Sequence, residues 1–126
     1  MKAMHKREKV DLLINHLWKD GYLTLSRKYG KYLPAPPSIC GYEVDAISKY
    51  KKKYAIGITV SEEELNDPKF ISRIENILRF RNLNPENKVT LYIGVPNELL
   101  LKAQILISSL EVEKQKNIKI IPLSEK

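Results

Sequence analysis

The sequence predicts a single α/β domain in which a mixed five-stranded sheet carries helices on both faces. The chain has 126 residues, 43% of them hydrophobic, which is enough for one buried core. Short runs rich in β-branched and aromatic residues alternate with longer runs of helical periodicity. Their order is α-β-β-β-α-β-α-β, a hairpin followed by two crossover units, so residues 1–126 are treated as one domain.

The first expected element is an amphipathic helix over residues 5–20. Apolar residues from Val10 to Trp18 recur at helical spacing, and Gly21 supplies a C-terminal stop. The whole apolar stripe, Trp18 included, is predicted to lie in the core. A strand is expected directly after the helix, at residues 22–25.

A loop and a hairpin are predicted next. Residues 26–41 contain three prolines and two glycines and have no periodicity, which indicates a long surface loop of the kind that often carries function. The runs at 42–47 and 54–60, joined by a Lys-rich turn at 48–53, pair most simply as an antiparallel hairpin. Cys40, the only cysteine, excludes an internal disulfide and is expected to be a small buried thiol.

Two main helices and two strands are predicted in the second half. Ser61 and Glu64 have the spacing of a capping box, and residues 62–66 are expected to form a short turn. A proline at the first helical position predicts a helix over residues 68–82. The remaining elements are a buried strand at 89–95, a helix at 98–113 and a last strand at 118–121.

The net charge of +7 lies in the first half of the chain. Residues 1–54 contain twelve Lys and Arg against five Asp and Glu, whereas residues 55–126 contain ten of each. Two basic clusters include tyrosines, which favours a nucleic-acid partner because cations bind phosphates and tyrosines stack on bases. The alternative is a solubilising Lys-rich surface. The candidate contacts are Arg27, Lys28, Tyr29, Lys31 and Tyr32 in the first cluster and Lys49, Lys51, Lys52 and Lys53 in the second.

The sequence carries no targeting signal. No apolar run is long enough to span a bilayer, and no signal-peptide h-region follows the basic N-terminus. We therefore expect no membrane partner and a cytoplasmic protein. The Lys-, Glu- and Ile-rich composition with few glutamines is typical of a thermophilic source.

The segment from Pro36 to Asp45 and the strand after it resemble the active-site hairpin of the PD-(D/E)XK nuclease superfamily. In that hairpin an Asp ends a short apolar strand and the next strand carries Glu-x-Lys. In size and layout the chain is most similar to archaeal Holliday-junction resolvases. The resemblance implies a restriction-endonuclease-like fold and a DNA partner that can be branched. The sequence match covers residues 36–65, and the order of elements extends it over nearly the whole chain.

The resemblance also implies that most of the catalytic set is lost. When the preceding Ile-Gly is aligned with the family's Ile-Gly, Ile58 stands at the metal-binding Glu and Val60 at the Lys. Val10 stands where such resolvases carry a Glu in the first helix. Only Asp45 matches, and one carboxylate alone neither holds Mg²⁺ in octahedral geometry nor positions a water. The favoured function is therefore a nucleic-acid-binding pseudonuclease that needs no cofactor.

Two other functions stay open. Glu43 and Asp45 share a strand face and Glu62 follows the next strand, so these carboxylates can rebuild a site. Asp45 would then be the metal ligand of an active endonuclease that uses Mg²⁺ or Mn²⁺. Alternatively, the domain is a non-catalytic subunit that binds another protein, and Asp45 is only the partner of a nearby lysine.

A homodimer is also expected from the resemblance, since resolvases of this kind usually work as dimers. The helix at 98–113 is apolar nearly all round, which indicates that it is covered on more than one side. The residues offered for the contact are Leu99, Leu101, Ile105 and Leu106.

Overall fold

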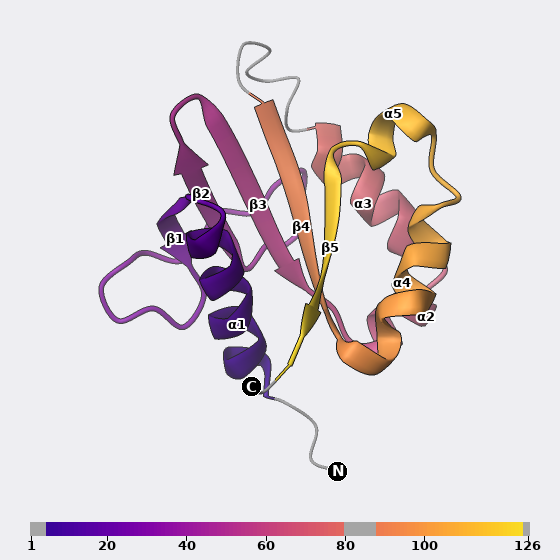
Figure 1. Cartoon of the computed structure of the whole chain (residues 1–126), viewed down its shortest axis with the longest axis horizontal. Coiled ribbons are helices and arrows are strands. Elements are labelled where there is room, and N and C mark those ends of the chain that lie inside the picture. Colours follow the sequence, from indigo (N-terminus) through magenta and orange to yellow (C-terminus); the bar gives the residue numbers. More distant parts are fainter. Residues whose placement is uncertain (1–4, 80–87, 125–126) are drawn as a thin grey trace.

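The structure is a computed structural model of the chain, and it describes residues 5–79 and 88–124. These residues form one small α/β domain that follows the predicted order of strands and main helices (Figure 1). The helices are α1 (Lys6–Lys19), α2 (Glu62–Asn66), α3 (Phe70–Leu78), α4 (Leu100–Ile107) and α5 (Val112–Gln115), with a 3₁₀ turn η2 (Asn97–Leu99) before α4. The strands are β1 (Leu23–Arg27), β2 (Ala46–Tyr50), β3 (Lys53–Thr59), β4 (Lys88–Pro96) and β5 (Ile118–Leu123).

The five strands belong to one mixed sheet with the order β1-β2-β3-β4-β5. β1, β2 and β3 pair antiparallel, whereas β4 runs parallel to both β3 and β5. Parallel neighbours need crossovers, which α2 and α3 supply between β3 and β4, and α4 and α5 supply between β4 and β5. The predicted mixed five-stranded sheet is therefore confirmed.

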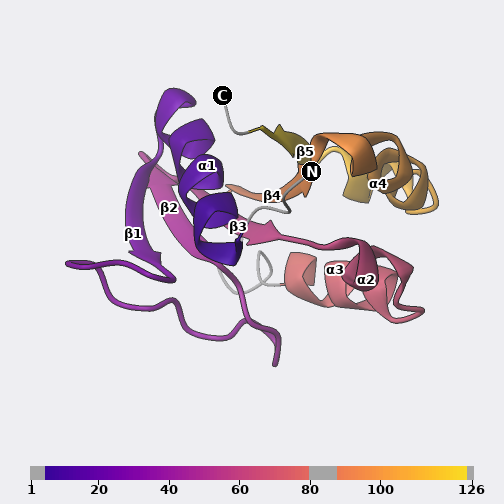
Figure 2. The same ribbon diagram turned by 90° about the horizontal axis from the view of Figure 1, so that it is seen from below.

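Helix α1 covers one face of the sheet (Figure 2). Leu13 and Leu17 of α1 belong to an apolar cluster with Tyr92 of β4 and Leu123 of β5. Gly57 of β3 lies beneath the helix, where an added Cβ atom would come within 2.8 Å of Leu13 Cδ2. Glycine at this strand position therefore allows α1 to pack close to the sheet.

The opposite face carries α3 and α4 over a larger apolar cluster. Alternate residues of β3 and β4 point into this cluster, because side chains along a strand alternate between faces. Burial on both faces explains why the two strands read as nearly continuous apolar runs. The cluster includes Ile56, Ile58, Val60, Ile74, Ile77, Leu91, Ile93, Ala103 and Ile107.

The hairpin turn is shorter than the predicted turn at 48–53. Strands β2 and β3 pair as far as Tyr50 and Lys53, which leaves only Lys51 and Lys52 in the turn. The lysines at these strand ends are exposed to solvent, so their charges do not destabilise the strands. The second basic cluster is therefore the tip of a hairpin rather than a separate loop.

Two residues predicted to be buried are exposed. Trp18 is 66% exposed, because it lies about 100° around α1 from Leu17, which the sheet covers. Cys40 is also exposed. It shares a tight turn with Gly41, both with positive φ (51° and 84°), and the neighbouring Ile39 enters the core in its place.

Helix α2 spans the predicted residues 62–66, whereas α3 differs from the prediction at its start. The capping box is present, with Glu64 N donating to Ser61 Oγ and Ser61 N donating to Glu64 Oε1. Helix α3 begins at Phe70, two residues late, after a turn in which Phe70 N donates to Asp67 O at 2.9 Å. The predicted end at residue 82 lies outside the described residues.

The helix predicted over residues 98–113 is divided into η2, α4 and α5. Ala103 and Ile107 of α4 are buried, as expected for its sheet-facing side. Leu101 and Ile105 are exposed, so the described residues of the chain itself cover only one side of this helix. Among residues 5–79 and 88–124, no helix has the length and apolarity needed to cross a membrane.

Candidate nucleic-acid interface

Asp45 is a buried carboxylate next to β2 that binds the end of β3. Thr59 donates to Asp45 Oδ2 from its backbone amide (2.6 Å) and from its hydroxyl Oγ1 (3.0 Å). The ladder between β2 and β3 ends at Ala46 and Gly57, so the carboxylate supplies the acceptor that a longer β2 would provide. Asp45 therefore completes the hydrogen bonding of the strand end.

Two lysines balance the charge of Asp45. Lys6 Nζ, from the first turn of α1, donates to Asp45 Oδ2 (3.1 Å) and to the Thr59 carbonyl (2.9 Å). Lys28 Nζ lies 3.6 Å from Asp45 Oδ1 and 3.1 Å from Glu43 Oε1. Partial burial lowers the pKa of Lys28, but the Glu43 hydrogen bond and the charges of Asp45 and Glu43 outweigh it, and the pKa is raised. Lys28 therefore stays charged at neutral pH and forms ion pairs with the carboxylates of Asp45 and Glu43.

Two of the three positions that the resemblance assigns to lost catalytic residues, Ile58 and Val60, lie on the opposite side of β3 from the Asp45 carboxylate. Val10, Ile58 and Val60 are at most 1% exposed. Ile58 and Val60 belong to the apolar cluster beneath α3 and α4, whereas the Asp45 carboxylate contacts Thr59 and α1. Strand alternation separates them, because Ile58 and Thr59 point to opposite faces of β3. The geometry gives no support to Ile58 and Val60 as the remains of a Glu-x-Lys site.

The three carboxylates of the alternative metal site are also dispersed. Glu43 is exposed and pairs with Lys28. Glu62 is exposed in the first turn of α2, where a carboxylate interacts favourably with the helix dipole. Within the two described ranges, no group of three or more His, Cys, Asp and Glu side chains is placed to hold a metal ion. Glu43, Asp45 and Glu62 therefore do not form a ligand set in this structure.

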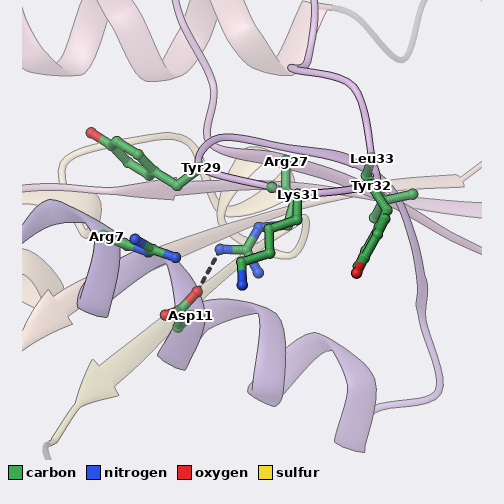
Figure 3. A pocket seen from close by; sticks show the side chains of 8 residues that line it. Arg7, Asp11, Arg27, Tyr29, Lys31, Tyr32 and Leu33 are labelled. Atoms are coloured by element: carbon green, nitrogen blue, oxygen red, sulfur yellow. Dashed lines mark hydrogen bonds and ion pairs between the residues drawn. The ribbon is translucent and has the colours of Figure 1, made fainter.

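A basic hollow lies between α1 and the loop that follows β1 (Figure 3). Its volume is about 350 Å³, near the lower end of the ~300–1,000 Å³ of typical ligand sites. All members of the first basic cluster except Lys28 therefore line a concave surface, which we name the loop pocket. Its lining consists of Arg7, Asp11, Arg27, Tyr29, Gly30, Lys31, Tyr32 and Leu33.

The outer wall of the loop pocket is a closed loop tied to the sheet. Arg27 N donates to Pro34 O, and Lys28 N donates to Asp45 O, each at 2.9 Å. Tyr29 has a φ of +61°, a left-handed conformation that costs a bulky residue about 1 kcal/mol or more. The fold therefore maintains a strained tyrosine at the rim of the pocket.

Cations outnumber carboxylates in the loop pocket. Arg27 Nη2 pairs with Asp11 Oδ1 at 2.5 Å, while Arg7 and Lys31 have no ion-pair partner among the described residues. Figure 3 shows Arg7 and Lys31 on either side of this pair. The excess positive charge therefore faces the hollow and suits an anionic ligand.

Sequence reasoning missed the contribution of α1 to this site. Arg7 and Asp11 are four residues apart, which places them on one face of the helix. That spacing was readable from the sequence, but the loop that covers this face is determined by tertiary packing. Lys6, the partner of Asp45, was missed for the same reason.

The second basic cluster lies at the far end of the hairpin. Six residues of extended chain separate Asp45 from Lys51, a span of about 20 Å at ~3.3 Å per residue. The antiparallel register agrees, since Arg27 is opposite Ala46 whereas Leu23 is opposite Lys49. The two basic clusters therefore lie at opposite ends of β2, because a strand places its two ends far apart.

The tyrosines of the hairpin tip are covered by lysines of the same tip. Lys49 Nζ lies 5.3 Å from the ring centroid of Tyr54, and Lys51 Nζ lies 5.4 Å from that of Tyr50. Tyr50 also contacts the ring of Tyr22, with ring centroids 6.3 Å apart. These rings already have cation–π or aromatic partners.

The described surface thus combines a concave basic pocket, a separate lysine tip and an internally neutralised Asp45. This arrangement can bind phosphate groups and planar rings. In comparisons with known proteins, no family model and no curated protein matches the chain.

Proposed function

We propose that this protein is a nucleic-acid-binding domain without a hydrolytic centre. The observation that carries the proposal is the loop pocket, in which three cations and two tyrosines line one hollow. Cations at a concave surface attract a phosphate backbone, and tyrosines beside them add faces for stacking. The hairpin tip, about 20 Å from the pocket end of β2, supplies further cations along the same ligand.

We propose no hydrolytic activity because of the contacts that Asp45 makes. Phosphodiester hydrolysis needs carboxylates free to hold Mg²⁺ and a group that positions water. Lys6 and Lys28 already occupy the Asp45 oxygens together with Thr59. A metal would have to displace at least one ammonium group from a buried carboxylate.

We also propose a relation to the PD-(D/E)XK fold. Its support is topological: a leading helix, an antiparallel meander that continues into parallel strands, and an Asp next to the second strand. Ile58 and Val60 add nothing to this support because they lie in the apolar cluster under α3 and α4.

The proposal is tested by fluorescence anisotropy with a labelled four-way junction, duplex and single strand over a salt series, with Ca²⁺ present to prevent cutting. We expect binding that weakens with salt. The Arg7→Ser/Lys31→Ser variant should lower the log-log salt slope by about 1.8, at ~0.9 per lost phosphate contact. The matched control is Lys69→Ser/Lys116→Ser, which removes two exposed lysines outside both basic surfaces.

The alternatives give different results in the same experiments. An active endonuclease would cleave with Mn²⁺, lose cleavage in Asp45→Ala and keep it in Ile58→Ala. A protein-interaction subunit would bind none of the nucleic acids even at low salt, and this outcome would overturn the proposal.

A further inference from the structure

The tyrosines of the two basic surfaces differ in how freely their rings can stack on a ligand. Tyr50 and Tyr54 at the hairpin tip have lysine ammonium groups over their rings. Tyr32 in the loop pocket is 95% exposed and Tyr29 is 50% exposed. Within residues 5–79 and 88–124, no aromatic ring or cation stacks on either of them. Of the two basic surfaces, the loop pocket therefore has the more exposed tyrosines, since Tyr50 at the hairpin tip is 41% exposed and carries a lysine over its ring.

The pocket also has the chemistry to accept a base and a phosphate together. Tyr29 and Tyr32 lie toward opposite ends of the hollow, with the cations between them (Figure 3). Leu33 adds an apolar wall, and Asp11 adds a carboxylate that can accept from base amino groups. A duplex buries its base faces in the helical stack, so it presents only phosphates to such a site.

We infer that the loop pocket binds one unpaired nucleotide, with its base against Tyr32 or Tyr29 and its phosphate at Arg7 and Lys31. The inference rests on the proposed function and assigns separate roles to the two surfaces. The pocket selects unpaired nucleotides, as found in single strands, overhangs and branch points. The hairpin tip binds phosphate backbone whether or not the bases are paired.

The backbone conformation of the loop supports a nucleotide-binding role for the loop pocket. Tyr29 holds a left-handed φ that glycine would adopt without strain, yet the position carries a large aromatic side chain. Gly30 next to it is tightly enclosed, since an added Cβ would lie 3.0 Å from Arg27 Cγ and 3.1 Å from the Leu33 carbonyl. The loop therefore holds a fixed shape while it presents the Tyr29 ring at the pocket.

The test compares two labelled duplexes that carry overhangs with the same number of phosphates, one with bases and one abasic. Charge is equal in the two ligands, so a preference measures contacts to bases alone. We expect the base-bearing overhang to bind at least about fivefold more tightly, as one stacked base provides. At least one of the variants Tyr32→Ser and Tyr29→Gly should reduce this preference toward one, and that variant identifies the ring on which the base stacks.

Two further variants make the result specific. Tyr29→Gly is expected to fold normally, because it relieves the left-handed strain, and circular dichroism checks this. Lys51→Ser/Lys52→Ser should weaken both overhangs by the same factor and leave the preference intact.

The failures are distinguishable. Equal binding of the two overhangs, or a preference that both tyrosine variants retain, overturns the inference and leaves the proposed function standing. No binding of either overhang at low salt overturns both.

Discussion

The Asp45 carboxylate accepts hydrogen bonds from Thr59 and Lys6 and lies within ion-pair distance of Lys28. We expect Asp45→Asn to lower the free energy of unfolding by about 2–3 kcal/mol, because Lys6 then loses its counter-ion and Lys28 keeps only Glu43. Urea denaturation of the wild type and the variant measures this loss. Nucleic-acid affinity of the folded variant should change less than twofold.

The control for this prediction is Asp11→Asn. Asp11 pairs with Arg27, but its side chain is 51% exposed, so the loss should stay below about 1 kcal/mol. Unchanged stability in Asp45→Asn, combined with loss of a metal-dependent cleavage activity, would show that Asp45 is catalytic rather than structural.

Tyr92 gives the molecule an alkaline limit to its stability. Burial and a hydrogen bond from Tyr92 Oη to Asp20 Oδ2 (2.6 Å) raise the pKa of Tyr92 above 10.0, and burial also raises the pKa of Tyr22. The folded state therefore keeps protons that the unfolded state releases. The contribution of Tyr92 to the free energy of unfolding should be constant below about pH 10 and fall as the pH rises further.

Urea titrations between pH 8 and pH 11 check this pH dependence, with Tyr92→Phe as the decisive variant. Loss of the Asp20 hydrogen bond should cost about 1 kcal/mol at neutral pH. The variant should also show a shallower decline at alkaline pH, and a decline as steep as that of the wild type would assign the effect to other groups.

At the scale of elements, α1 shows how sharply burial changes between adjacent residues. Leu17 is fully buried, whereas Trp18 is 66% exposed. Leu17→Ala should therefore lower the free energy of unfolding by about 2–5 kcal/mol, and Trp18→Ala by no more than about 0.5 kcal/mol. A large loss in Trp18→Ala would mean that the tryptophan is covered in solution.

Periodicity was sufficient to predict the elements whose burial follows a simple pattern. The continuous apolar run of β4 and the stripe of α1 were predicted within one or two residues at each end. The capping box of Ser61 and Glu64 was also predicted, because it depends on local hydrogen bonds alone. Trp18 was wrongly predicted to be buried because its spacing fits the apolar stripe of α1. The width of the sheet determines which residues of that stripe are covered.

The residue types of the candidate site were predictable from the sequence, but the elements that come together to form it were not. The first basic cluster and its tyrosines were identified from the sequence, and all its members except Lys28, which pairs with Glu43 and Asp45, line one hollow. The contributions of Lys6 and Arg7 come from α1, far away in sequence. Their meeting with the loop depends on how α1 crosses the sheet, and no local pattern in the sequence encodes that crossing.

At the scale of the molecule, charge is divided between the two halves of the chain. The +7 excess belongs to residues 1–54, while residues 55–126 are balanced. Both basic surfaces come from the first half, together with α1, β1 and β2. A second copy would meet strong repulsion on this side and least repulsion on the side of α4 and α5.

For the homodimer that the resemblance implies, we propose the exposed face of α4 and α5, where charge opposes association least. Leu101, Ile105 and Val112 are each more than 60% exposed there. Association through this face would bury apolar area and keep both basic surfaces of each copy outward. The dimer would then present two loop pockets to one nucleic acid and gain affinity from their linkage.

Sedimentation equilibrium over a concentration series tests this arrangement. Ile105→Lys should abolish self-association and change the free energy of unfolding of the monomer by less than about 0.5 kcal/mol, since the side chain is exposed. Leu25→Lys, at an exposed apolar residue of β1, is the matched control and should leave association intact. A wild-type protein that stays monomeric at high concentration, or a dimer that survives Ile105→Lys, would contradict the assignment of this face. Loss of the dimer in Leu25→Lys would instead place the contact at the β1 edge of the sheet.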